Sequence, residues 1–94
     1  MNASKKNGAT PMYIAAQYGH TEVVKLLLTS KADMNASYDD GFTPLHIAAQ
    51  NGHTEVVKLL IANKAYVNAR RANGERPIDA ARRNQHFEII QLLQ

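Results

Sequence analysis

The stretch TPLHIAAQNGHTEVVKLL, residues 43–60, decides the fold of this chain because the chain repeats it. A close copy, TPMYIAAQYGHTEVVKLL, occupies residues 10–27, and a weaker copy, RPIDAARRNQHFEIIQLL, occupies residues 76–93. Successive copies start 33 residues apart. A fixed period of this length indicates one small supersecondary unit stacked on copies of itself, so that no unit has to bury a core alone.

Each of the first two copies contains the start and stop signals of a short helix. Thr10 and Thr43 precede a proline, and a threonine at this place accepts hydrogen bonds from free backbone N–H groups of the first turn. Gly19 and Gly52 can adopt the left-handed conformation that ends a helix. These signals predict first helices over residues 11–18 and 44–51.

A second helix is predicted in each of these copies, over residues 21–29 and 54–62. Its apolar stripe is too wide to face a single partner. We therefore expect the stripe to be covered from two sides, by the first helix of its own copy and by the neighbouring copy. The apolar residues of the two stripes are Val23, Val24, Leu26, Leu27, Leu28, Val56, Val57, Leu59, Leu60 and Ile61.

The segments between copies have the composition of turns. Residues 39–41 are Asp-Asp-Gly and residues 72–74 are Ala-Asn-Gly, and glycine supplies the positive φ that tight turns need. We expect a projecting, hairpin-like finger at each of these places.

Composition limits the class of protein. The 94 residues suffice for one domain at most, and no run of eighteen apolar residues or secretory signal is present. The chain has no cysteine, which excludes disulfides and thiolate ligands. We expect an intracellular, cytoplasmic protein or, if the source is microbial, one delivered into a host cell. The net charge is +3, and all five arginines fall in the last quarter of the chain: Arg70, Arg71, Arg76, Arg82 and Arg83.

The repeated text resembles the ankyrin repeat family. The resemblance runs through Thr-Pro-Leu-His-Ile-Ala-Ala (residues 43–49), Gly-His-Thr-Glu-Val-Val-Lys-Leu-Leu (52–60) and Val-Asn-Ala (67–69), and it extends over essentially the whole chain. It implies an all-α fold, an ankyrin-repeat solenoid of helix-turn-helix units joined by short β-hairpin-like loops. It also implies that the fingers and the concave helices bind other proteins, without catalytic activity.

The register of the copies predicts how the single domain, residues 1–94, is divided. Residues 1–4 align with residues 34–37, one period later, and are interpreted as the tail of a preceding repeat, so that the chain looks like a fragment of a longer array. Repeat 1 then covers residues 5–37, repeat 2 residues 38–70 and repeat 3 residues 71–94. Repeat 3 resembles a C-terminal capping repeat, because Arg76, Asp79, Arg82 and Gln94 replace Thr, His, Ala and an apolar residue.

Positions that differ between copies are the candidates for partner binding. On the family's geometry they lie at the finger tips and at the ends of the inner helices, where exposed aromatic residues can anchor a partner and arginines can supply charged hydrogen bonds. Packing along the hairpin or solvation of the end of the array is the structural alternative for each. The predicted partner-binding residues are Tyr18, Tyr38, Asp39, Asp40, Phe42, Asn51, Arg70, Arg71 and Arg83.

These positions favour a non-catalytic module that binds a protein or peptide partner through its fingers and concave face. The alternative is a passive spacer or scaffold segment of a longer ankyrin array. Binding to nucleic acid or anionic lipid rests on the arginine charge alone and is not expected. We also expect no small-molecule substrate, no membrane insertion and a monomeric chain.

The four histidines are interpreted as structural. His20, His53 and His86 recur at one repeat position, too far apart to bind one metal ion, and are predicted to hydrogen bond within and between repeat loops. His46 is predicted to make a capping hydrogen bond. The chain contains no nucleophile–base pair, P-loop or dinucleotide-binding glycine pattern. We therefore expect no enzyme activity, no catalytic or metal-binding residues and no cofactor.

Three residues stand where the family usually has glycine. Lys31 and Lys64 follow the second helices and Gln85 follows the first helix of repeat 3, so each is expected to be left-handed. Asn35 resembles the target of an asparaginyl hydroxylase that acts on this family, and the structural alternative is that its side chain holds a turn.

Overall fold

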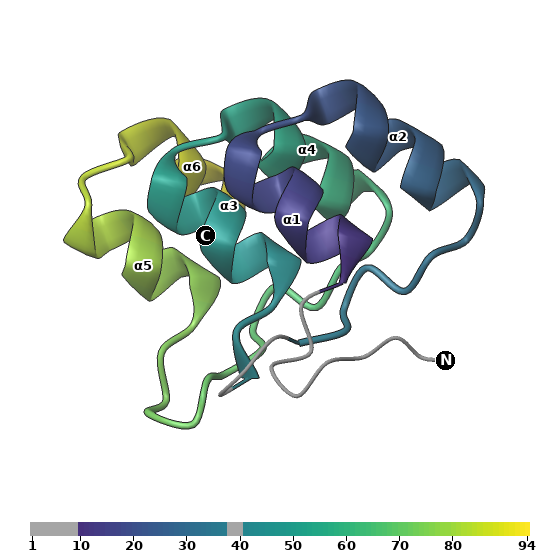
Figure 1. Ribbon diagram of the computed structural model, residues 1–94. Coiled ribbons are helices and arrows are strands. Elements are labelled where there is room, and N and C mark those ends of the chain that lie inside the picture. Colours follow the sequence, from purple (N-terminus) through teal and green to yellow (C-terminus); the bar gives the residue numbers. More distant parts are fainter. Residues whose placement is uncertain (1–9, 38–40) are drawn as a thin grey trace.

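The computed structural model describes residues 10–37 and 41–94, and this part of the chain forms six helices and no strand. The helices follow one another as three pairs (Figure 1). They are α1 (Pro11–Tyr18), α2 (Thr21–Thr29), α3 (Pro44–Asn51), α4 (Thr54–Ala62), α5 (Pro77–Arg83) and α6 (Phe87–Leu93). The bounds of the first four helices are those that the sequence predicts.

The predicted caps explain these bounds. Oγ1 of Thr10 accepts a hydrogen bond from the backbone N–H of Tyr13 (3.1 Å). Oγ1 of Thr43 accepts one from the N–H of His46 (3.2 Å). At the other end of α3, Gly52 takes φ 78°. A hydroxyl cap and a left-handed glycine therefore set the length of these short helices.

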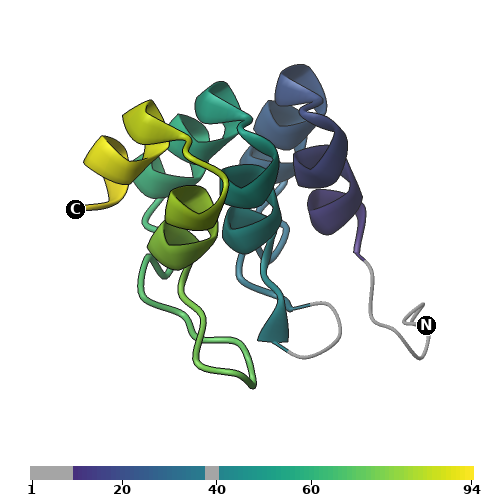
Figure 2. The ribbon, with the colours of Figure 1, turned by 90° about the vertical axis from the view of Figure 1, so that its left-hand side faces the viewer.

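The three helix pairs stack side by side. Helices α1, α3 and α5 form one row, and α2, α4 and α6 form a second row behind it (Figures 1 and 2). Each helix contacts its partner in the pair and the equivalent helix of an adjacent pair. The segments 30–37 and 63–76 extend from the same end of the helix pairs (Figure 2).

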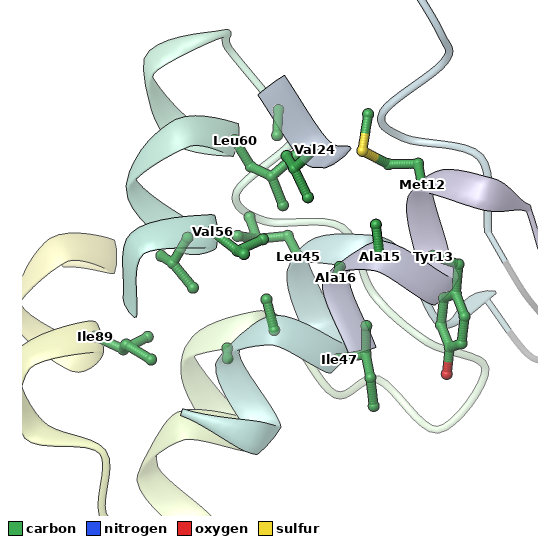
Figure 3. Close-up of a cluster of buried hydrophobic side chains, with 14 of the residues drawn as sticks. Met12, Tyr13, Ala15, Ala16, Val24, Leu45, Ile47, Val56, Leu60 and Ile89 are labelled. Atoms are coloured by element: carbon green, nitrogen blue, oxygen red, sulfur yellow. The ribbon is translucent and has the colours of Figure 1, made fainter. Parts of the chain in front are cut away.

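The core runs through the stack and joins the pairs (Figure 3). The first helices contribute alanines with no side chain beyond Cβ, which lets neighbouring rows approach closely. The second helices contribute branched residues that fill the space between rows. Fully or almost fully buried members are Met12, Ala16, Val24, Leu45, Ala48, Ala49, Val56, Val57, Leu60, Ala81 and Ile89.

The expected two-sided cover of the apolar stripe is present for both α2 and α4, but in α2 it leaves part of the stripe exposed. Val56 of α4 is fully buried, whereas its counterpart in α2, Val23, is 44% exposed and Leu26 is 67% exposed. The reason is position in the stack: α4 lies between α2 and α6, whereas α2 packs on α1 and α4. Among the described helices, none lies on the other side of α2.

The three expected left-handed residues are confirmed. Lys31, Lys64 and Gln85 have φ values of 64°, 69° and 59°. The glycines at the equivalent place in repeats 1 and 2 are also required by a close contact. A Cβ placed on Gly19 or Gly52 would lie within 3.0 Å of the ring of His53 or His86 in the next repeat.

A hairpin turn is present at the second predicted finger. The backbone N–H of Arg71 donates to the carbonyl of Glu75 (2.9 Å), and the N–H of Gly74 donates to the carbonyl of Arg71 (2.8 Å). Gly74 has φ 86°, and Oδ1 of Asn73 accepts from the N–H of Glu75 (2.9 Å). Residues 39 and 40 of the first predicted finger lie outside the described residues.

Repeat 3 caps its first helix without the threonine of the other copies. Oδ2 of Asp79 accepts from the backbone N–H of Arg76 (3.0 Å) and from its Nε (3.2 Å). These hydrogen bonds from Arg76 lower the pKa of the Asp79 carboxyl below its ordinary value. Asp79 thus accepts from the N-cap N–H, as Nδ1 of His46 does in repeat 2, and the hydroxyl cap of the first two copies is absent.

Candidate functional site

A buried carboxylate organises the surface between the hairpin turn and α5. The side chain of Glu75 is 8% exposed and accepts from Nη1 of Arg71 at 2.9 Å. Its second oxygen pairs with Nη1 of Arg83, the last residue of α5. Nη2 of Arg83 also reaches Oε1 of Gln50 (3.4 Å) on α3. Because a buried carboxylate needs compensating charge, Glu75 fixes both guanidinium groups in place.

Phe42 joins this group from the side of repeat 2. The guanidinium of Arg71 lies 4.2 Å from the centre of the Phe42 ring, which is a cation–π contact. The same ring makes edge-to-face contacts with Tyr13 (5.9 Å between centroids) and His46 (5.8 Å). We name Phe42, Arg71, Glu75, Arg83 and Gln50 the Glu75 cluster.

His46 ties the cluster to the cap of α3. Nε2 of its ring donates to the carbonyl of Glu75 (2.8 Å), and Nδ1 accepts from the backbone N–H of Thr43 (3.2 Å). This set of partners fits the neutral ring with its proton on Nε2. Burial lowers the pKa of His46 below its ordinary value of 6.5, so the ring stays neutral at pH 7.

The structure brings three of the predicted partner-binding residues together and separates the others. Phe42, Arg71 and Arg83 meet around Glu75. Asn51 is an inter-repeat contact, since its Nδ2 donates to the carbonyl of Gln17 (3.1 Å). Tyr38, Asp39 and Asp40 lie outside the described residues.

The remaining two predicted residues are exposed. Tyr18, at the end of α1, is 62% exposed, and its ring lies 6.0 Å from that of His20. Arg70 is exposed at the base of the hairpin turn, where its Nη1 donates to the carbonyl of Gly74 (3.4 Å). Both side chains are available to a partner.

Sequence reasoning missed the residues that hold the site together. Glu75 occupies the position of Ala9 and Phe42 in the other copies, and it is not among the predicted partner-binding residues. The signal was present in the spacing, because Arg71 and Arg83 lie four and eight residues from Glu75. Two cations that close to one acid could have marked it as their shared partner.

The predicted hydrogen bonds of the repeated histidines to a neighbouring repeat are confirmed for His53 and His86. Nε2 of His53 hydrogen bonds to the carbonyl of Gln17 (3.0 Å), and Nε2 of His86 makes the same bond to the carbonyl of Gln50 (3.0 Å). Asn35 likewise has a structural contact, since its Oδ1 accepts from the N–H of Tyr66 (2.9 Å). Hydroxylation of Asn35 stays a prediction.

The stacked pairs, their hairpin turn and their recurring caps agree with the comparison with known families. A family model described as ankyrin repeats (three copies) matches residues 1–71 and, in a second and overlapping match, residues 30–94. The chain belongs to the ankyrin repeat family. Ankyrin repeats are generally non-catalytic and generally act as protein–protein interaction modules. No curated protein matched the chain.

Two further properties of these ankyrin repeats concern the described residues only. No helix among them is both long and apolar enough to cross a membrane. Within the same ranges, no group of three or more His, Asp or Glu side chains is arranged to hold a metal ion. The Glu75 cluster consists of ion pairs, a cation–π contact and a hydrogen bond to Gln50, and its arginine side chains can also donate hydrogen bonds to another molecule.

Proposed function

We propose that this chain is a non-catalytic module that binds a protein partner through its hairpin loops and the face of α1, α3 and α5, the concave face by the family's geometry. One observation carries the proposal. At the ends of the helices in this row, Tyr18, Asn51 and Asn84 stand at one repeat position that differs between copies and are exposed, whereas the alanine that all three copies share is buried (Ala15, Ala48 and Ala81).

The ends of the three helices illustrate this division. Ala16 of α1 and Ala49 of α3 are fully buried in the core. Tyr18 at the end of α1 and Arg83 at the end of α5 are exposed. A rigid scaffold that presents different side chains from equivalent positions is suited to recognise one partner surface. Tyr18 offers the kind of rigid, amphipathic ring that often anchors an interface.

The test compares two variants, each with two alanine substitutions, by affinity capture from extracts of the source cell. In the first, Tyr18→Ala and Arg70→Ala remove exposed side chains of the proposed surface. In the control, Glu22→Ala and Lys25→Ala remove exposed side chains of α2, in the second row. We expect quantitative mass spectrometry to show partners lost by the first variant and kept by the control.

Other results would revise the proposal in different ways. Partners lost only by the control would place the binding surface on the second row. A wild-type chain that captures nothing above background would favour the spacer role, in which the repeats only position other parts of a longer protein. Phe42 and Arg71 are left unchanged in this test because their contacts also support the fold.

A further inference from the structure

We propose that the partner presents an acidic segment, and that its carboxylates dock on Arg70 and Arg83 at the edge of the Glu75 cluster. This inference rests on the proposed function and adds the chemistry of the partner. It starts from the charge. Residues 70–83 hold five arginines and two carboxylates, an excess of three positive charges, while six lysines and six carboxylates in the rest of the chain cancel.

The two guanidinium groups flank one short piece of backbone. Arg70 donates to the carbonyl of Gly74, and Arg83 pairs with the carboxylate of the next residue, Glu75. One comes from the start of the hairpin turn and the other from the end of α5. The fold thus places two cations, thirteen residues apart in sequence, against two consecutive residues of the chain, Gly74 and Glu75.

Both groups remain accessible. The side chain of Arg83 is 53% exposed even though it pairs with Glu75, and Arg70 is exposed and, within residues 10–37 and 41–94, contacts no carboxylate. Planar guanidinium groups with free N–H donors are matched to carboxylates, which they can bind through two hydrogen bonds. Glu75 holds Arg83 in position beforehand, so less side-chain freedom is lost when a partner binds.

The surroundings favour a peptide over a nucleic acid. Single strands bind basic surfaces that also offer open aromatic rings for base stacking. The ring of the Glu75 cluster, Phe42, is not free for stacking, because it packs against Arg71, Tyr13 and His46. What is open beside Arg83 is the amide of Gln50, a hydrogen-bonding group that suits a peptide backbone or side chain.

The experiment selects displayed random short peptides on the full chain. We expect the enriched peptides to be rich in Asp and Glu, and a synthetic copy of one of them to bind more weakly as NaCl increases. The double variant Arg70→Gln and Arg83→Gln should bind this peptide about tenfold more weakly or worse. The matched control, Lys25→Gln and Lys31→Gln, loses the same charge from α2 and its loop and should bind within about twofold of the wild type.

Three results overturn the inference. Enriched peptides without an acidic excess that bind the arginine variant equally well would leave the proposed function standing with a different partner chemistry. A wild-type chain that enriches no peptide would count against both proposals. Single-stranded DNA that binds more tightly than the acidic peptide would assign the surface to nucleic acid. If circular dichroism shows that the double variant is unfolded, Arg70→Gln alone replaces it in the test. This single variant leaves the Arg83–Glu75 pair intact, and it should still bind the acidic peptide more weakly than the wild type.

Discussion

Helices α2 and α4 begin with the same seven residues, Thr-Glu-Val-Val-Lys-Leu-Leu, and bury them differently. In α4 both valines and the second leucine are fully buried, whereas in α2 only the second valine is. The local sequence and the helix are equal, so the difference comes from the neighbours. Identical residues in a stacked protein therefore contribute different amounts to stability, according to how many repeats cover them.

The largest expected contrast concerns the first valine of this segment. Val56→Ala removes buried methyl groups and leaves a cavity, and should lower the free energy of unfolding by about 2–3 kcal/mol. Val23→Ala removes the same atoms from a half-exposed site and should cost about 0.5 kcal/mol. Urea denaturation of both variants measures the difference. Equal losses would mean that α2 is covered as fully as α4.

A second pair of variants compares the stability lost through a clash with the next repeat with the stability lost through local backbone strain alone. Gly52→Ala forces a side chain into φ 78° and places its Cβ 2.7 Å from Cε1 of His86, which also threatens the hydrogen bond of that ring to Gln50. We expect a loss of about 2 kcal/mol. Gly74→Ala has similar strain, at φ 86°, and no atom within 4 Å, so it should lose about 1 kcal/mol. A greater loss for Gly74→Ala in thermal melts would contradict this account.

A third pair of variants should show no contrast between repeats. Lys31 and Lys64 are both left-handed, and glycine removes that strain, so Lys31→Gly and Lys64→Gly should each stabilise the chain by about 1 kcal/mol. The gain is local to the backbone and does not depend on the neighbouring repeat. Unchanged or lower melting temperatures in both variants would show that the strain is relieved in another way.

The smallest expected effect is a pH dependence that belongs to repeat 2, because repeat 1 has Tyr13 in place of His46. The lowered pKa of His46 means that, below pH 6.5, the unfolded chain binds a proton that the folded chain does not. Stability should therefore fall as the pH drops from 6.5 to the folded-state pKa, and not change further through this group. His46→Gln should flatten the slope in urea denaturation at several pH values. A slope that survives the substitution would have to come from other groups.

Much of the fold was predictable because its signals are local. The Thr-Pro caps and terminal glycines of repeats 1 and 2 act within a few residues, and the structure reproduces the helix bounds that they predict. Positive φ at Lys31, Lys64 and Gln85 was predictable for the same reason. The candidate site was harder to predict from the sequence. Phe42 and Asn51 are variable between copies, which suggested partner binding, but both make contacts between repeats.

The sequence by itself determined the repeated unit, the places where its helices start and stop, and the excess of positive charge in its last quarter. These properties depend on interactions over a few residues or on composition alone. Only the tertiary structure decided that Val23 is exposed while Val56 is buried, and that Glu75 gathers Arg71 and Arg83 beside Gln50. Burial and ion pairing depend on which repeats lie next to each other, and residues more than thirty positions apart in the chain meet only when the units stack.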